Sequence, residues 1–330
     1  MPWILGCAAP EPSTPDSDPP EAHAPAPWDE DAFWDTPGPL ADLVFPESVL
    51  EARWIVRVAT REAGGRWGGS PQAVLRDFNS FDVIATPRGL VLVGLLGATG
   101  RYNPDVASVA VFATQDLVQW STHIWEVEDA RGMNIVDPSL HRRPDGTYEL
   151  IYFGTTQFGV DPVWLPGPHA IRRAPWDEDA RVWREDPEDV VAYEGAVDPV
   201  VCNVGDEEWL FSTQSAVRVV ADRLDADGHL DHVPFHTWEG HSVPFCREHA
   251  DGLEVVAQSA AASGPPRVAQ FVGERFEDRG DLYEPFGWSN EVCTSPVIVA
   301  SGSRDLLFCA FLNHLVPPEH DVSTGTSATR

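Results

Sequence analysis

Four acidic residues of this chain have a spacing that suits acid–base chemistry. Asp82, Asp137 and Asp198 occupy one position of a repeated sequence pattern, and Glu194 precedes Asp198 by four residues. Carboxyl groups held close together raise the pKa of at least one of them, which keeps a proton donor available near neutral pH. Each aspartate also has a structural interpretation, because an aspartate before a proline can accept backbone N–H bonds and fix a turn or the start of a strand.

Polar residues near the same pattern are candidate ligand contacts. Asn79 and Asn134 stand three residues before Asp82 and Asp137, and serve either as hydrogen-bond donors to a ligand or as polar fillers of a channel. Glu291 repeats the offset of Glu194, as Glu239 does, so this glutamate belongs either to a binding site or to the repeat itself. His241 is a further candidate contact, although a lone histidine is more often a structural residue.

The elements that position these residues follow from five copies of the pattern. In four copies an apolar segment runs into a proline, and in the degenerate first copy, at 78–83, Val83 takes the proline position. The steps between copies are 55, 61, 45 and 52 residues. A strand-like run follows every copy, at 89–96, 148–153, 208–212, 253–257 and 305–310. A hairpin that recurs at this spacing predicts an all-β, five-bladed β-propeller, in which the first strand of each blade lines a central channel.

The strands of the first and last blades extend this prediction. Ser108 to Ala113 is expected as the third strand of blade one and Ile124 to Val127 as the fourth. Too little chain follows Ala310 to complete a fifth blade. We therefore expect Trp54 to Thr60 to pair with the fifth blade and close the ring, which removes the open edges.

Two motifs carry a family resemblance. Thr114-Gln115-Asp116-Leu117-Val118-Gln119-Trp120 resembles the link between the third and fourth strands of a blade in the five-bladed propeller glycosidases, namely glycoside hydrolase family 43 and its arabinanase, invertase and levansucrase relatives. Val136 to Leu140, followed by Arg143 to Phe153, is similar to the opening hairpin of a blade in these enzymes. The resemblance covers about Val56 to Leu312.

The resemblance implies roles for the acidic residues in glycoside hydrolysis, which requires an acid and a base or nucleophile. Asp82 matches the aspartate base of blade one, and Asp137 matches the aspartate of blade two that orients and tunes the acid. The glutamate acid of blade three falls on Val197, and Glu194 and Asp198 are its substitutes within reach. We expect a glycoside hydrolase-like enzyme acting on carbohydrate. The alternative is a non-catalytic carbohydrate-binding or scaffold propeller on a lipoprotein.

The composition of the chain excludes some classes of binding partner. The 330 residues are 43 % hydrophobic and carry a net charge of −30, which disfavours binding to nucleic acid. The longest apolar run, Gly89 to Ala98, is too short to span a membrane. No Cys-x-x-Cys or Cys/His spacing indicates zinc, so the prediction includes no metal and no cofactor. A monomer is expected.

The N-terminus suggests export. Ile4-Leu5-Gly6-Cys7 is similar to the lipobox of bacterial lipoproteins, in which the cysteine is lipidated. Only six residues precede Cys7, so either the gene start lies further upstream or Cys7 is an ordinary thiol. We expect a lipobox at 1–7, a disordered acidic, proline-rich tether at 8–45, the propeller at 46–315 and a flexible tail at 316–330. This arrangement would anchor the protein to the bacterial cell envelope.

The other four cysteines also bear on whether the protein is exported. In an exported chain Cys202, Cys246, Cys293 and Cys309 would form two disulfides with three possible connectivities, and in the cytoplasm they would be buried apolar fillers. Cys202 and Cys246 follow the repeated proline in neighbouring blades. They are therefore the preferred pair.

Overall fold

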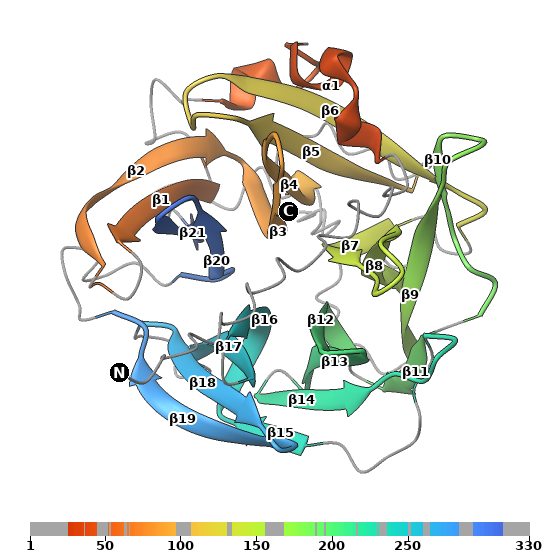
Figure 1. The fold of residues 1–330 in the computed structure, drawn as a ribbon, viewed down its shortest axis with the longest axis vertical. Coiled ribbons are helices and arrows are strands. Elements are labelled where there is room, and N and C mark those ends of the chain that lie inside the picture. Colours follow the sequence, from red (N-terminus) through yellow and green to blue (C-terminus); the bar gives the residue numbers. More distant parts are fainter. Residues whose placement is uncertain are drawn as a thin grey trace, which may run out of the picture.

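The computed structural model contains five blades arranged around a central axis (Figure 1). It describes residues 26–35, 37–44, 52, 54–62, 65, 67–96, 107–130, 134–155, 168–188, 190–194, 196–215, 217–228, 230, 236–249, 252–259, 265–283 and 293–312. Within this part of the chain no helix is long and apolar enough to span a membrane. The predicted all-β propeller is confirmed.

Each of blades one to four is an antiparallel sheet of consecutive strands, with the first strand innermost. Blade one consists of β3 (Phe78–Thr86), β4 (Gly89–Leu96), β5 (Ser108–Thr114) and β6 (Trp120–Glu128). Blade two consists of β7 (Asn134–Arg142), β8 (Tyr148–Thr155), β9 (Pro168–Asp177) and β10 (Val182–Arg184), with β11 (Val191–Glu194) paired to β9. Blade three consists of β12 (Ala196–Val204), β13 (Glu207–Gln214), β14 (Arg218–Arg223) and β15 (His236–Glu239). Blade four consists of β16 (His241–His249), β17 (Gly252–Ser259), β18 (Arg267–Val272) and β19 (Arg275–Asp281).

Blade five joins the two ends of the propeller. Its inner strands are β20 (Val297–Ser301) and β21 (Arg304–Leu312), and its outer strands are β1 (Trp54–Glu62) and β2 (Gly68–Arg76). β1 pairs antiparallel with β21 along its whole length, from Trp54 opposite Leu312 to Glu62 opposite Arg304. The predicted closure is therefore confirmed, and it includes a second N-terminal strand, β2, that the sequence pattern did not indicate.

Two side chains stabilise the turn in the Thr114–Trp120 motif. The Asp116 carboxylate accepts hydrogen bonds from the N–H groups of Val118 and Gln119, at 2.8 and 2.7 Å, and the Thr114 hydroxyl accepts one from Leu117, at 2.8 Å. Leu117 takes a left-handed conformation with φ of 63°. Side chains that bond to nearby backbone in this way specify a turn locally, which explains why the motif was legible in the sequence.

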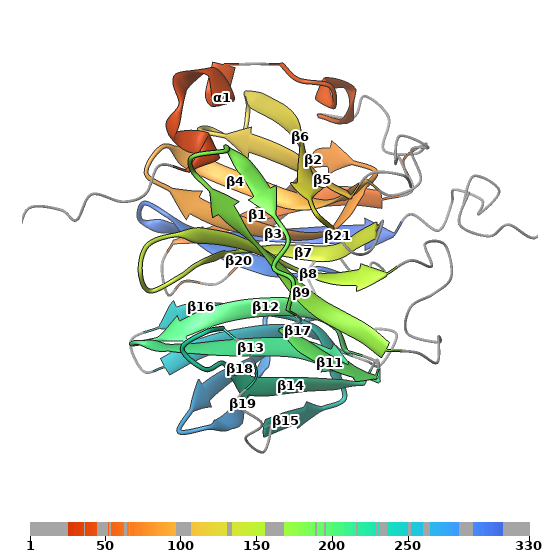
Figure 2. The ribbon, with the colours of Figure 1, turned by 90° about the vertical axis from the view of Figure 1, so that its right-hand side faces the viewer.

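The predicted tether at 8–45 is wrong for residues 26–35 and 37–44. A 3-10 helix (Pro27–Asp29), α1 (Asp31–Asp35) and a second 3-10 helix (Ala41–Leu43) pack on the rim of blade one, with α1 beside β6 (Figures 1 and 2). Trp28, Phe33, Leu40 and Leu43 are buried there. These large apolar side chains outweigh the acidic and proline-rich composition, because burying each one contributes roughly 2 kcal/mol or more.

Two disulfides connect the described cysteines. Cys202 on β12 is bonded to Cys246 on β16, which joins blades three and four, and Cys293 is bonded to Cys309 on β21 within blade five. The preferred pairing from the sequence is confirmed.

Candidate functional site

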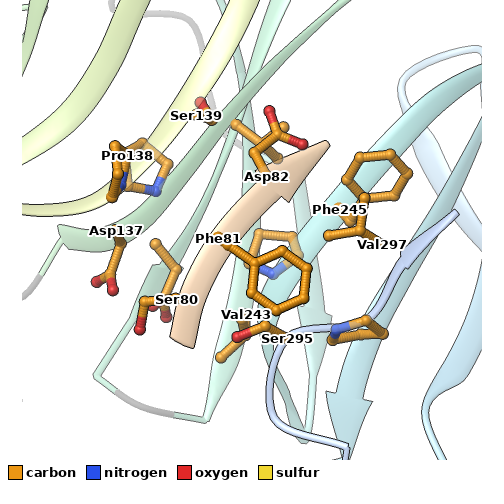
Figure 3. A pocket seen from close by; sticks show the side chains of 15 residues that line it. Ser80, Phe81, Asp82, Asp137, Pro138, Ser139, Val243, Phe245, Ser295 and Val297 are labelled. Carbon is orange, nitrogen blue, oxygen red and sulfur yellow. The ribbon is translucent and has the colours of Figure 1, made fainter. Parts of the chain in front are cut away.

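A small cavity lies on the axis, where the inner strands of all five blades meet (Figure 3). Its volume is about 40 Å³, room for only a few water molecules. The described residues that line it come from the repeated pattern, three from each blade: Ser80, Phe81, Asp82, Asp137, Pro138, Ser139, Asp198, Pro199, Val200, Val243, Pro244, Phe245, Ser295, Pro296 and Val297. The repeat therefore builds the cavity.

A β-bulge in the inner strands of blades one to four directs these side chains inward. The ladder is interrupted between Asn79 and Asp82 in β3, and at the corresponding points of β7, β12 and β16. In each bulge one residue has a positive φ; these are Ser80 at 44°, Asp137 at 50°, Asp198 at 52° and Val243 at 50°. A bulge of this kind re-aims a side chain, and here it directs one residue per blade to the axis.

The bulges correct the alignment of the first copy. Ser80, not Asp82, is equivalent to Asp137 and Asp198, and Phe81 takes the proline position. Asp82 lies two residues further along its strand, at the level of Ser139, whereas Ser80 and Asp137 lie together at another level (Figure 3). Two aspartates, not three, therefore occupy the shared position.

Spacing could have revealed this register. The second strand of the hairpin begins eight residues after the repeated proline in blades three, four and five. In blade one β4 begins eight residues after Phe81, but only six after Val83. Because the first copy lacks a proline, the turn at Gly89 was the better reference point for the alignment.

Asp137 and Asp198 form a carboxyl pair on the axis. Their side chains are hydrogen-bonded to each other, and both are partly exposed to the cavity. Burial, and after it the negative charge of Asp198, raises the pKa of Asp137 well above its ordinary value. Burial also raises the pKa of Asp198, against the hydrogen bonds of the Thr213 hydroxyl, Asp137 and the Val243 N–H. The two carboxyl groups therefore titrate together, and each takes up a proton at a higher pH than an ordinary aspartate does.

The Ser80 side chain is hydrogen-bonded to Asp137, and this contact favours the charged form of that carboxyl. Ser80 is the contact that sequence reasoning missed. A hydroxyl has both donor and acceptor capacity, so it completes the polar end of the cavity without adding a third charge.

Asp82 is in a different environment from the pair. It is buried, and its carboxylate accepts hydrogen bonds from the N–H of Val83 at 2.7 Å and of Leu140, in the next blade, at 3.0 Å. Burial outweighs these bonds and the attraction of His141, and raises the pKa of Asp82 to about 6. The contacts are those of a residue that joins blades one and two.

The other candidate residues do not gather at the cavity as one site. Asn79 lies on β3, and its buried Oδ1 has no hydrogen-bond partner within the described part of the chain. His241, on β16, stacks on Trp238 with ring centroids 3.9 Å apart and is not among the described residues that line the cavity; burial lowers its pKa. Asn134 begins β7 and Glu194 ends β11 opposite Pro168, but their side chains lie outside the described part. Glu291 and Cys7 also lie outside the described residues.

Comparisons with known proteins agree with this architecture. No protein-family model matches the chain, and no curated protein matches it. Among solved structures, a thermostable family-43 glycoside hydrolase superposes with a TM-score of 0.51 at 9 % identity, over 71 % of this chain and 88 % of that one. An α-L-arabinofuranosidase from Clostridium thermocellum gives 0.50 at 14 % identity, over 68 % and 78 %.

In a third similar structure, the superposed part is a smaller share of the other protein. An exo-β-1,3-galactanase from Phanerochaete chrysosporium gives a TM-score of 0.47 at 9 % identity over 71 % of this chain, which spans 60 % of the galactanase chain. At such identities similarity shows the fold. The chain has the five-bladed β-propeller fold of the family-43 glycoside hydrolases, as its motifs predicted.

Proposed function

We propose that this chain is a carbohydrate-binding propeller with the glycosidase fold, and that it does not hydrolyse its ligand through the family's set of three acids. The observation that carries the proposal is the residue at the blade-one position equivalent to Asp137 and Asp198, which is not a carboxylate. A glycosidase needs a base or nucleophile about 5–10 Å from its acid. Asp137 corresponds to the family's tuning aspartate, so its contact with Asp198 does not supply that pair.

Ser80 supports the same conclusion. It occupies the blade-one position that corresponds to Asp137 and Asp198, so no carboxylate base stands there. Asp82, which the family resemblance offered as the base, is buried and held by two backbone N–H groups. Water needs an accessible base to be activated.

Carbohydrate is the ligand class that the polar end of the cavity suits. Ser80 and the two carboxyl groups offer hydrogen-bond donors and acceptors without a positive group, which suits neutral sugar hydroxyls. A family-43 β-1,3-galactosidase with the same fold, at a TM-score of 0.50 and 8 % identity, was solved with galactodeoxynojirimycin, a sugar analogue. A cavity of about 40 Å³ admits a hydroxyl group and not a whole ring, so the ring would lie at the mouth.

Hydrolysis is the second candidate. Two neighbouring carboxyl groups with raised pKa values can serve as an acid and a base, and both members are partly exposed. In this alternative Asp137 and Asp198 would exchange the proton with the leaving group, and Glu194 would supply the remaining carboxylate.

Binding and turnover measurements on the same variants separate the two candidates. We expect the wild-type chain to bind one class of glycan on an array and to leave nitrophenyl glycosides and the bound glycan uncleaved. Asp137→Asn and Asp198→Asn should weaken binding about tenfold or more, because each changes the donor pattern at the axis. Asp116→Asn, in an exposed turn, is the control. Turnover that is lost in Asp137→Asn and kept in Asp116→Asn would establish the hydrolase instead.

We also propose export and lipid anchoring at Cys7. Two disulfides within one chain support an oxidising compartment, since such bonds are rare in the cytosol. The test is fractionation of Cys7→Ser expressed with its native upstream codons. Unchanged membrane association in that variant would contradict the anchor.

A further inference from the structure

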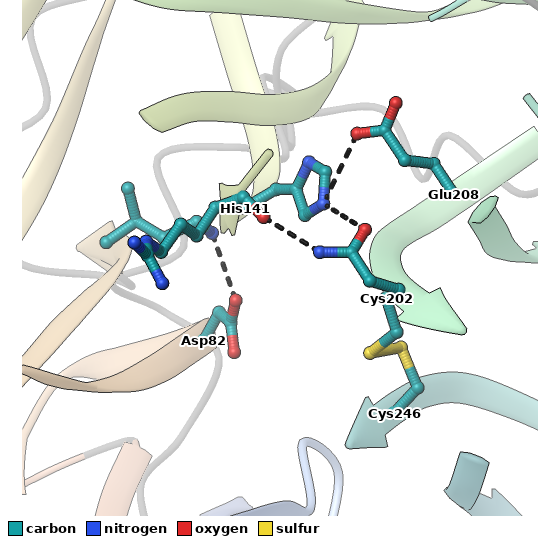
Figure 4. The surroundings of a disulfide bond; sticks show 8 residues. Asp82, His141, Cys202, Glu208 and Cys246 are labelled. Carbon is teal, nitrogen blue, oxygen red and sulfur yellow. Dashed lines mark hydrogen bonds and ion pairs between the residues drawn. A yellow bond between two sulfur atoms is a disulfide. The ribbon is translucent and has the colours of Figure 1, made fainter. Parts of the chain in front are cut away.

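A second group of polar side chains lies between blades two and three, further along the inner strands than the cavity (Figure 4). His141 is on β7, Glu149 on β8, Asn203 on β12 and Glu208 on β13. His141 and Glu149 are 3 % exposed and Glu208 is 7 % exposed. Its members come from four strands of two blades, which is why no sequence spacing indicated it.

The imidazole of His141 has oxygen atoms on both sides. Its Nδ1 lies 2.9 Å from Oε1 of Glu149, and its Nε2 lies 3.2 Å from Oδ1 of Asn203 and 3.6 Å from Oε1 of Glu208. The Asn203 amide is fixed in this direction, because its Nδ2 donates a hydrogen bond to the Arg142 carbonyl at 3.0 Å. Two oxygens therefore converge on one nitrogen.

Among the described residues, two of the buried carboxylate oxygens of this group find no hydrogen-bond partner. These are Oε1 of Glu208, which faces His141, and Oε2 of Glu149. The other Glu208 oxygen, Oε2, lies 3.7 Å from Nη2 of Arg143, so the arginine does not satisfy Oε1. A buried carboxylate oxygen without a hydrogen bond is costly, and Oε1 of Glu208 has instead an ion-pair contact of 3.6 Å with Nε2 of His141. A cation between Oε1, Nε2 and Oδ1 would remove that cost.

We propose that His141, Asn203 and Glu208 bind a divalent transition-metal ion of the zinc type. Atoms that each lie about 2.0–2.2 Å from a tetrahedral ion are roughly 3.3–3.6 Å apart, close to the observed 3.2 and 3.6 Å. Glu149 is a positioning residue, because it accepts the Nδ1–H of His141 and so presents Nε2 to the ion. Imidazole with oxygen ligands suits zinc better than magnesium or calcium, which prefer oxygen alone.

The surroundings provide an entry path and a role for the ion. Glu208 and Arg143 also line an open hollow at the surface, together with Arg223 and Asp225, from which water would take the fourth coordination position. The ion would join blade two to blade three, and Cys202, next to Asn203, is bonded to Cys246 of blade four. The metal and the disulfide would then hold three successive blades together.

The test uses the full chain after removal of metal with a chelator. We expect titration calorimetry to show one Zn²⁺ per chain, and a hundredfold excess over Kd to raise Tm by about 4–5 °C. Mg²⁺ at the same concentration should leave Tm unchanged. No zinc binding, or an equal rise in Tm with Mg²⁺, would overturn the proposal.

Variants locate the ion. Glu208→Gln keeps the side-chain volume and should weaken zinc binding by at least tenfold, and Glu149→Gln should weaken it 10- to 100-fold. His141→Ala should abolish it, and near-ultraviolet circular dichroism shows which variants are folded. His236→Ala, which removes a partly exposed histidine 3.7 Å from Glu274, is the matched control and should bind as wild type does. Wild-type affinity in folded Glu208→Gln, or loss of binding in His236→Ala, would place the zinc elsewhere and refute the site.

Discussion

At the scale of single residues, position along one bulged strand decides what a carboxyl group does. Asp137 and Asp198 occupy the residue of positive φ and meet on the axis, where burial raises the pKa of both. Asp82 lies two residues further along and is held by backbone N–H groups of two blades. The three carboxyl groups are all desolvated and all line the cavity, but Asp82 is buried whereas Asp137 and Asp198 are partly exposed.

One substitution measures how much Asp198 contributes to the raised pKa of Asp137. In Asp198→Asn the neighbouring charge is removed, so we expect the pKa of Asp137 to fall. It should stay above its ordinary value of 3.8, because burial is the larger cause of its elevation. Carboxyl ¹³C chemical shifts followed against pH measure this. The pKa of Asp82 is the internal control, since Asp198 is not among its causes, and a pKa of Asp137 unchanged by the substitution would contradict the coupling.

Asp82 should make stability depend on pH. Its pKa is about 6 in the folded chain and near 3.8 when unfolded, so the folded state binds the proton more tightly. Its contribution to stability is therefore present below about pH 4 and is lost as pH rises through 6, a change of about 3 kcal/mol. Urea unfolding at pH 4.5 and 7.5 should show a smaller loss in Asp82→Asn than in wild type. An equal loss of stability between pH 4.5 and 7.5 in the two proteins would contradict this account.

At the scale of elements, the structure attaches an N-terminal segment to blade one. The Trp28 ring packs edge-on against the Tyr148 ring, with centroids 4.7 Å apart, and its centroid lies 6.1 Å from that of Trp125. The Phe33 ring stacks on the His123 ring, with centroids 4.2 Å apart. The N–H of Leu40 donates to the Thr122 hydroxyl at 3.1 Å. The segment covers aromatic side chains of β6 that would otherwise meet water.

Trp28→Ala should therefore destabilise the whole propeller. We expect a loss of about 3–5 kcal/mol in the free energy of unfolding, as for other buried tryptophans, together with faster proteolysis of residues 26–44. Val118→Ala, at a side chain that is 64 % exposed, should change stability by less than about 0.5 kcal/mol. A Trp28 variant as stable as wild type would show that the segment is dispensable.

The sequence predicted these elements unevenly, for physical reasons. β4 was predicted with the bounds it has, Gly89 to Leu96, because a continuous apolar run with a turn on its N-terminal side marks a buried strand. The packing of Trp28 and Phe33 was missed, because proline and acidic content describe a segment on average while a few large side chains decide its burial. The repeat predicted that Asp82, Asp137 and Asp198 would meet at one point. Asp137 and Asp198 occupy that position, but in blade one it is occupied by Ser80, which was missed because the first copy has no proline to mark its register.

At the scale of the whole molecule, one non-local strand pairing closes the ring and two disulfides cross-link it. β1 joins β21, so the first and last strands of the propeller share a sheet, and no chain connection is needed at that point. Cys202–Cys246 crosses from blade three to blade four, whereas Cys293–Cys309 stays within blade five. Both bonds restrict the unfolded chain, but over loops of different length.

Loop length predicts which of the two disulfides contributes more to the free energy of unfolding. The two bonds have sequence separations of 44 and 16 residues, for which chain entropy gives stabilisations of about 4 and about 3 kcal/mol. The double variant Cys202→Ala/Cys246→Ala should therefore unfold at lower urea than Cys293→Ala/Cys309→Ala, when both are measured without reductant. Reductant should destabilise wild type and leave a variant lacking all four cysteines unchanged. The opposite order would mean that native packing around Cys293 and Cys309, both fully buried in blade five, outweighs the entropy of the longer loop.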